Sequence, residues 1–79
     1  MHYVYLIRSL NFPKQTYTGY TTNIDQRLDE HNSGKSVHTQ KYKPWEMVSY
    51  VAFTSKEKAL DFERYLKSGS GRAFAARHF

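Results

Sequence analysis

The segment ALDFERYL (residues 59–66) places an acidic side chain on the inward face of an expected helix. Ala59, Phe62 and Leu66 recur at i, i+3 and i+7, which is the spacing of a helical stripe that faces a core. Because successive residues are about 100° apart around a helix, Glu63 falls within the same arc. A carboxylate there is costly unless it is paired, hydrogen-bonded or bound to a cation. Glu63 therefore either lies at the edge of the stripe, where it reaches out to solvent or pairs with a nearby Lys or Arg, or it is a ligand for a cation.

A second expected helix also carries polar groups on its inner face. Asn23 begins a capping-box pattern, which predicts a helix that starts there and stops at Gly34. Ile24 marks the buried side, yet Arg27 and His31 lie i+3 and i+7 from it, on the same side. Arg27 and His31 are also four residues apart, so their side chains lie one above the other.

Two explanations account for polar groups on both inner faces. The first is a salt bridge between Arg27 and Glu63, which contributes little net stability when it is buried. The second is a binding or catalytic site to which both helices contribute. A small domain has little core to spare, so we favour the second explanation.

The balance of charge favours a polyanionic partner. Twelve Lys and Arg against seven Asp and Glu give a formal net charge of +5, and the chain also has seven tyrosines. Basic and aromatic groups together suit phosphates and the sugars or bases beside them, although a basic surface kept for solubility has the same charge. Residues 35–43 and the chain after Glu63 are basic and lack acids. The candidate nucleic-acid-binding residues are Lys35, Lys41, Lys43, Lys67 and Arg72.

Three features bound the class of protein. The length of 79 residues predicts one small domain, residues 1–79, with a modest core. The absence of cysteine excludes disulfides and thiolate zinc sites and fits a reducing compartment. Residues 1–12 lack the long apolar run of a signal peptide or membrane span, so we expect a cytoplasmic protein with no membrane attachment.

The strands are expected in the first and middle parts of the chain. Residues 2–8 and 15–20 are rich in β-branched and aromatic side chains and predict two strands, joined as an antiparallel hairpin by a turn at residues 10–15. Gly19 weakens the second strand unless a bulge or a close backbone approach requires it. Residues 46–53 predict a third strand.

The helices complete an α+β fold. Thr54 is the predicted cap of the second helix, which ends before Gly69. Residues 71–79 predict a short final helix, from which Phe74 and Phe79 would pack on the core. The expected order is β-β-α-β-α-α: a small three-stranded antiparallel sheet flanked by helices.

Several motifs resemble those of the GIY-YIG nuclease family. Tyr3-Val4-Tyr5 and Tyr17-Thr18-Gly19 resemble its paired GIY and YIG signatures. Residues 19–35 resemble its strand-to-helix passage, and residues 62–75 its continuation in small stand-alone bacterial-type members. Residues 44–48 resemble the third-strand entry of those members and of the catalytic subunit of structure-specific endonucleases. The resemblance covers essentially the whole chain and also extends to the N-terminal domain of the excision-repair nuclease.

The resemblance implies a role for each of five residues. Tyr17 matches the catalytic tyrosine, and Arg27 matches the contact to the scissile phosphate. Glu63 matches the protein ligand of one divalent cation, Mg²⁺ or Mn²⁺. Tyr5 and His31 match further functional positions. Whether Tyr17 or His31 takes the proton from the attacking water stays open, because either group suits the task.

Two residues depart from the family pattern. Tyr3 stands at the glycine of the first signature, and Tyr20 stands where the excision-repair relatives have a lysine. The resemblance implies a metal-dependent DNA endonuclease of repair or recombination, with products that carry 5′-phosphate and 3′-hydroxyl ends. One alternative is a module that binds nucleic acid but cuts poorly, since Tyr20 replaces the lysine. Another is a subunit that needs a protein partner or a homodimer for targeting, because so short a chain neutralises few phosphates.

Overall fold

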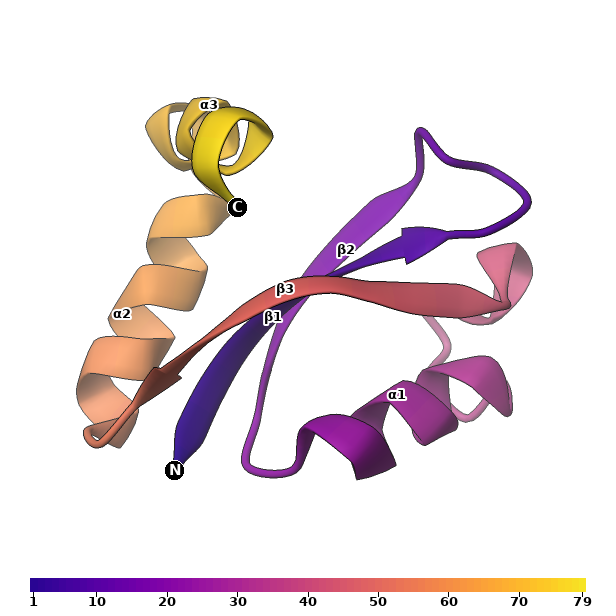
Figure 1. Ribbon diagram of the computed structural model, residues 1–79, viewed down its shortest axis with the longest axis horizontal. Coiled ribbons are helices and arrows are strands. Elements are labelled where there is room, and N and C mark those ends of the chain that lie inside the picture. Colours follow the sequence, from indigo (N-terminus) through magenta and orange to yellow (C-terminus); the bar gives the residue numbers. More distant parts are fainter.

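The computed structural model describes residues 1–79 as a three-stranded sheet with helices on both sides (Figure 1). The strands are β1 (His2–Ser9), β2 (Thr16–Thr21) and β3 (Trp45–Phe53). The helices are α1 (Ile24–Asn32), α2 (Lys56–Leu66) and α3 (Gly69–His78), with a 3-10 turn, η1 (Gln40–Tyr42), before β3. All strands are antiparallel in the order β2-β1-β3. The predicted fold and order of elements are confirmed.

The pairing of β1 with β2 decides which side chains share a face of the sheet. Tyr5 lies opposite Gly19, and Ile7 lies opposite Tyr17. Opposed residues of a pleated pair point to the same side, and residues two apart do so as well. Tyr5, Ile7, Tyr17 and Gly19 therefore all face the side on which α1 lies.

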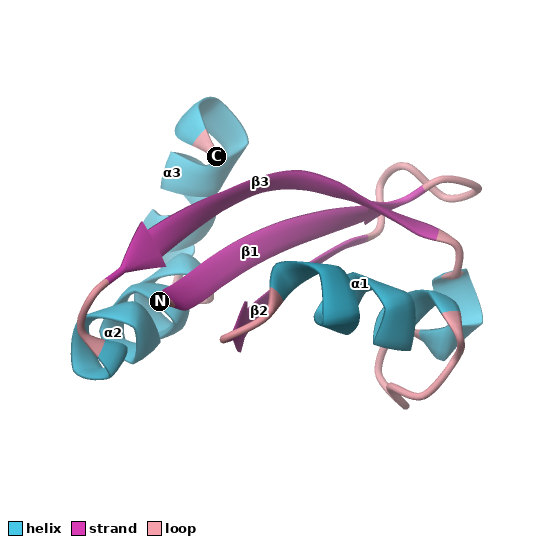
Figure 2. Cartoon of the chain, turned by 60° about the horizontal axis from the view of Figure 1, so that its bottom comes forward, coloured by secondary structure: helices cyan, strands magenta, loops and turns pink.

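Helices α2 and α3 lie away from α1, on the opposite face of the sheet (Figure 2). This face is packed with apolar side chains. Val4 and Ala59 are fully buried there, and Leu66 is 3% exposed. Phe74 and Phe79 pack against this cluster, as predicted for the final helix. Phe53 and Phe62 join them through tilted and edge-on ring contacts.

The face under α1 has a different character, because polar side chains are buried there beside apolar ones. Its apolar part consists of the buried residues Tyr5, Ile7 and Trp45, with Ile24 and Leu28 of α1 packed against them. The buried polar residues all bond to groups on this side: Ser9 to Tyr42, Thr21 to Asn23, and His31 to both Tyr5 and Thr39.

The helix ends test the predicted caps. Asn23 Oδ1 accepts the backbone N–H three residues on, at 3.0 Å, and Gly34 follows α1 with a positive φ of 81°. Both assignments are confirmed. The prediction that Thr54 caps α2 is wrong, because Ser55 has the extended backbone and its Oγ accepts the Lys58 N–H at 3.2 Å. The cap of the helix therefore lies one residue later than predicted, at Ser55 in place of Thr54.

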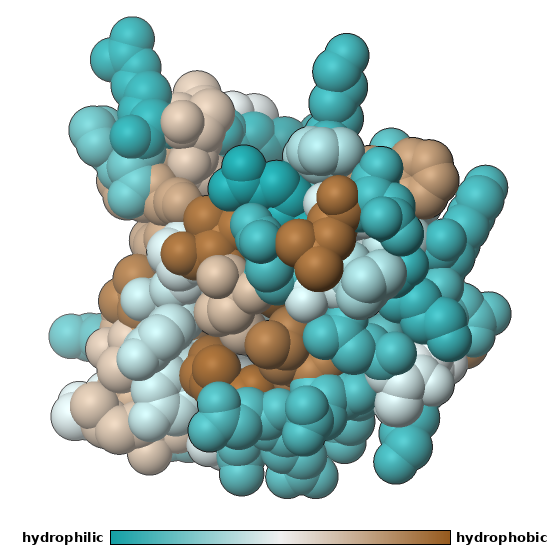
Figure 3. All heavy atoms as spheres, turned by 45° about the vertical axis from the view of Figure 1, so that its right-hand side comes forward, coloured by the Kyte–Doolittle hydropathy of each residue, from teal (hydrophilic) through white to brown (hydrophobic).

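The surface is mostly hydrophilic, with small apolar patches. Figure 3 shows hydrophilic side chains over most of one side and apolar patches near its centre. The large apolar residues that are exposed include Leu10, Phe12 and Val37. None of the helices combines the length and the apolar character needed to cross a bilayer.

Candidate active site

The five residues singled out for catalysis and metal binding line one hollow of about 230 Å³. Tyr5 comes from β1, Tyr17 from β2, Arg27 and His31 from α1, and Glu63 from α2. The hollow lies beside β2, an edge strand of the sheet, which α1 and α2 approach from opposite faces (Figure 1). The fold therefore gathers residues that are up to 58 positions apart (63 − 5) in the chain.

Gly19 makes room for the site. A Cβ atom at this position would overlap the hydroxyl and ring of Tyr5, which lies directly across the β1–β2 pair. The β1–β2 register runs without a shift, so the glycine serves a close approach and not a bulge. Of the two reasons that the sequence offered for Gly19, close approach is the correct one.

Tyr5, His31 and Thr39 form a buried chain of hydrogen bonds beneath the hollow. Tyr5 Oη lies 2.8 Å from His31 Nε2, and His31 Nδ1 lies 2.6 Å from Thr39 Oγ1. Burial raises the pKa of the Tyr5 phenol, so its hydroxyl keeps its proton at neutral pH. Burial, with the charge of Arg27 in addition, lowers the pKa of His31, so its ring is neutral there.

Tyr17 is the tyrosine of the site whose hydroxyl is free. Its Oη takes part in none of the hydrogen bonds of the chain, in contrast to those of Tyr5 and Tyr20. The Tyr17 ring meets the His31 ring edge-on at 5.5 Å, and Lys67 Nζ lies 5.6 Å from its centroid. Tyr17 therefore sits between a neutral ring and a cation, with its hydroxyl available to a substrate or to water.

Arg27 is placed to bind an anion. Its Nε atom is buried and has no hydrogen-bond partner in the chain. Its Nη1 lies 3.5 Å from Glu30 Oε1, a pair of neighbours on α1 that are both partly exposed. Glu63 is paired with Lys67 at 3.4 Å and not with Arg27, so the salt bridge considered for the two helices does not form.

Glu63 supplies the carboxylate of the hollow. Its side chain is 22% exposed, and no other acidic residue lines this space. No group of three or more His, Cys, Asp or Glu side chains lies together in a way that could hold an ion. One carboxylate with hydroxyl groups nearby fits Mg²⁺, which keeps several waters, and does not fit zinc, which takes three or four protein ligands.

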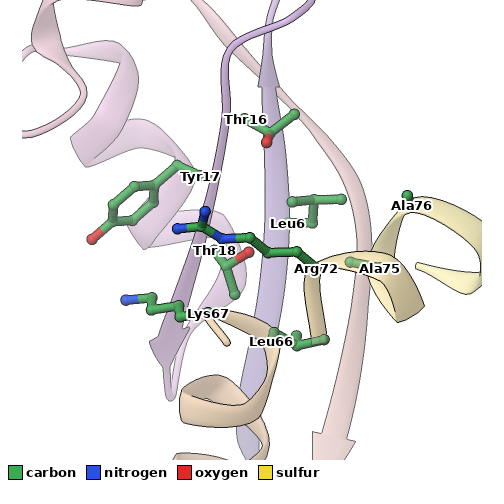
Figure 4. Close-up of a pocket in the computed structure, with 9 residues that line it drawn as sticks. All are labelled: Leu6, Thr16, Tyr17, Thr18, Leu66, Lys67, Arg72, Ala75 and Ala76. Carbon is green, nitrogen blue, oxygen red and sulfur yellow. The ribbon is translucent and has the colours of Figure 1, made fainter. Parts of the chain in front are cut away.

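Two of the five candidate nucleic-acid-binding residues lie beside the site. Lys67 and Arg72 line a groove of about 650 Å³ between β2 and α3, and Tyr17 lines both this groove and the hollow. In Figure 4, the Arg72 side chain reaches across the groove toward β2, and Lys67 lies on the same side as Tyr17. No acidic residue lines the groove, so it complements a negatively charged strand.

The other three candidates lie elsewhere. Lys35, Lys41 and Lys43 are exposed in the segment between α1 and β3, and none of them lines the hollow or the groove. Ser36 of the same segment does line the hollow. The structure thus brings the segment to the site but leaves its lysines on the outside.

Two residues that help to form the site were not among the site residues predicted from the sequence. Tyr20 lines the hollow, and its hydroxyl lies 2.7 Å from His2 Nδ1. The register of the hairpin indicates the contact between Tyr20 and His2. Tyr20 lies opposite Val4, and His2, two residues before Val4, points to the same face of the sheet. Thr39 is the other; it lies in a loop that carries no periodic pattern, so no sequence signal points to it.

The fold and the site together define a small α+β domain in which an arginine with an unpaired Nε and a lone carboxylate line one hollow beside a basic groove. Residues 1–75 match the model of the GIY-YIG catalytic domain. The chain belongs to the GIY-YIG nuclease family, as its motifs predicted.

Two relatives and one solved structure place the chain within the family. The UPF0213 protein BH0048 of Halalkalibacterium halodurans is 40% identical over 72 residues, which cover 90% of this chain and 74% of that protein. The structure-specific endonuclease subunit SLX1 of Debaryomyces hansenii is 44% identical over 71 residues, or 81% of this chain but only 20% of SLX1. The solution NMR structure of the UPF0213 protein BH0048 from Bacillus halodurans superposes with a TM-score of 0.56 at 35% identity, covering 96% of this chain and 82% of that one.

Proposed function

We propose that the protein is a divalent-metal-dependent DNA endonuclease and that the hollow is where the phosphodiester is hydrolysed. The observation that carries the proposal is the convergence of Tyr17, Arg27 and Glu63 on one hollow beside a basic groove. Membership of the GIY-YIG family supports the reaction class. One relative, SLX1, is named a structure-specific endonuclease subunit, which supports a DNA substrate recognised by its structure. We place this activity in DNA repair or recombination.

Arg27 binds the scissile phosphate. A guanidinium group is always charged and presents its N–H donors in a fork that matches phosphate oxygens. The buried Nε–H of Arg27, which lacks a partner in the chain, is one such donor. The charge of Arg27 stabilises the negative charge that develops on the phosphoryl oxygens during attack.

Glu63 would hold one Mg²⁺ or Mn²⁺ ion at the edge of the hollow. When bound, such an ion supplies Lewis acidity at the phosphate and stabilises the departing 3′-oxygen. Lys67, which pairs with Glu63 at 3.4 Å, is half exposed and contributes little to stability in that pair. Lys67 can therefore leave Glu63 and bind a phosphate of the substrate strand.

Tyr17, and not His31, acts on the attacking water. Both ring nitrogens of His31 are hydrogen-bonded, and the residue is 1% exposed, so it presents no free nitrogen to a water in the hollow. The Tyr17 hydroxyl has no partner in the chain, and Tyr17 lines the hollow. Lys67 Nζ lies 5.6 Å from the centroid of its ring, on the side of the basic groove.

A partner-dependent subunit is the second candidate. The SLX1 relative is named a subunit, and this chain corresponds to one-fifth of its length. Lys67 and Arg72 neutralise few phosphates, so the isolated chain should bind DNA weakly and lose affinity steeply with salt. A protein partner or a homodimer would provide the missing affinity.

The test is cleavage of labelled duplex, flap and four-way-junction DNA with Mg²⁺ or Mn²⁺. Glu63→Gln and Tyr17→Phe should each lower the rate by about 100-fold or more, while salt-sensitive binding persists. Asp61→Asn is the matched control, because this carboxylate is on the same helix but is 65% exposed and paired with Arg64. If the wild type binds all three substrates and cuts none with either metal, the partner-dependent candidate replaces the first proposal.

A further inference from the structure

The chain of hydrogen bonds from Tyr5 to Thr39 ends in two very different environments. Thr39 is fully buried, and its Oγ1 makes no hydrogen bond other than the one with His31 Nδ1. Tyr5 lies at the wall of the hollow, and its hydroxyl bonds to His31 Nε2. The direction in which protons are donated along this chain therefore decides whether the Tyr5 hydroxyl has its proton free for a group in the hollow or donates it to His31.

Counting protons leaves two possible directions. The neutral His31 ring has one N–H, and each hydroxyl has one O–H, so three protons serve the two hydrogen bonds between the groups. In the first direction Tyr5 donates to Nε2, and Nδ1–H donates to Thr39. In the second direction Thr39 donates to Nδ1, and Nε2–H donates to Tyr5 Oη.

The first direction leaves a buried donor without an acceptor. If Nδ1–H donated to Thr39, the Thr39 proton would have to find another acceptor, and no other bond to Thr39 Oγ1 is present. Buried donors are almost always satisfied, because an unmade hydrogen bond in the interior is costly. In the second direction only the Tyr5 proton has no acceptor within the chain. That proton points to the hollow, where water or a ligand can accept it.

Thr39 is also held in a fixed position, from which its hydroxyl can donate to His31 Nδ1. Its carbonyl oxygen accepts a hydrogen bond from Trp45 Nε1 at 2.9 Å, and its N–H donates to Ser36 O at 3.2 Å. The backbone of Trp45 is bonded in turn to the side-chain amide of Asn32, at the end of α1. Because His31 precedes Asn32 directly, the loop and the histidine are fixed to the same turn of helix.

We propose that Thr39 is a positioning residue that holds His31 in the tautomer protonated at Nε2. The Nε2–H then donates to Tyr5 Oη, and the proton of Tyr5 is directed into the hollow. Tyr5 is in this way a hydrogen-bond donor for an anionic oxygen bound beside Arg27. This last role rests on the proposed function, whereas the tautomer of His31 does not.

The tautomer is read directly from the nitrogen chemical shifts of the imidazole rings. In long-range proton–nitrogen spectra of the labelled wild-type protein at pH 7.5, His31 should show a protonated Nε2 and an unprotonated Nδ1. Protonation at Nδ1, or a rapid mixture of both forms, would overturn the proposal. This reading needs no variant, so it decides the matter even if a substitution unfolds the protein.

Two substitutions of Thr39 separate positioning from packing. Thr39→Val keeps the shape but removes the hydroxyl, so His31 Nδ1 loses its only donor and its nitrogen resonance should shift toward that of a nitrogen without a hydrogen bond. Thr39→Ser keeps the hydroxyl and should restore the wild-type resonance. An unchanged His31 spectrum in Thr39→Val would overturn the proposal. In the cleavage assay, Thr39→Val should lower kcat by about tenfold or more with little change in KM, and Thr39→Ser should recover most of it. A wild type that shows the expected tautomer but cuts no DNA would refute the proposed function and leave the role of Thr39 intact.

Discussion

The two faces of the sheet are built on different physical principles. Under α2 and α3 the contacts are apolar, with Val4, Ala59 and Leu66 buried among phenylalanine rings. Under α1 the buried residues include His31 and Thr39, which are held by hydrogen bonds. Apolar burial is not directional and supplies stability, whereas hydrogen bonds fix the angles between groups.

The site lies where these two faces meet. The α1 face contributes four of the five predicted residues, and α2 contributes only Glu63. Hydrogen bonds fix Tyr5 and His31, and the strand register fixes the side of the sheet to which Tyr17 points. Phe62, the neighbour of Glu63, belongs to the apolar cluster. Changes to the apolar face should therefore alter stability first, and changes to the α1 face should alter the geometry of the site first.

The largest effect on stability is expected from Phe62→Ala. The Phe62 ring contacts three other phenylalanines, with centroid distances of 5.5 to 6.2 Å. Its removal should lower the free energy of unfolding by about 3 kcal/mol, measured by urea denaturation. DNA binding per folded molecule should not change. Phe62→Leu should lose clearly less, and a loss below about 1 kcal/mol for the alanine variant would contradict the packing of this face.

On the opposite face, Gly19→Ala should disturb the site as well as the fold. The added methyl group overlaps the Tyr5 hydroxyl, so Tyr5 must move away from His31. We expect a loss of about 1–3 kcal/mol in thermal or urea unfolding and altered His31 resonances. Gly69→Ala is the control, since nothing lies within 4 Å of its Cβ position. Equal behaviour of the two variants would show that the close approach at Gly19 is unimportant.

The buried histidine gives the α1 face a dependence on pH. Burial lowers the pKa of His31, Arg27 lowers it further, and Glu30 opposes the shift. The unfolded chain therefore binds a proton near pH 6.5 that the folded chain does not, and stability should fall as the pH is lowered from 7.5 to 5.5. For one proton the slope is at most about 1.4 kcal/mol per pH unit. Urea unfolding across this range should show it, and His31→Gln should remove that part of the slope.

The smallest effect is expected from the cap of α2. Ser55→Ala removes the acceptor of the Lys58 N–H and should lower stability by about 1 kcal/mol. Thr54→Ala removes no cap and should be close to neutral. Paired thermal melts of the two variants decide between the predicted and the observed start of the helix. A larger loss from the threonine variant would restore the original assignment.

Local patterns were sufficient to predict the fold and the inward orientation of Arg27, His31 and Glu63, whereas Tyr5 and Tyr17 were singled out by the resemblance to the family. Strand composition, the Asn23 cap and the spacing of Ala59, Phe62 and Leu66 all report on periodicity, which burial imposes along a single element. The spacing of Arg27 and Glu63 within these patterns indicated that polar groups point inward. Their convergence on one hollow agrees with that prediction.

What the sequence could not reveal depends on contacts between segments. Thr39 is buried because Trp45 and His31 close over it, and nothing in the loop around it indicates this. The pairing of Tyr20 with His2 requires the register of the hairpin. The choice between Thr54 and Ser55 as a cap depends on backbone angles that both residue types allow.

The spread of the site along the chain has a consequence for the timing of synthesis. Residues of the hollow run from Tyr5 to Glu63, so no segment that ends before α2 contains a complete site. A nascent polypeptide that has emerged as far as α1 has its tyrosines and Arg27 but lacks the carboxylate. Completion of the site must wait until α2 has left the ribosome and packed against β1 and β2, so a chain broken off before that point carries an incomplete site.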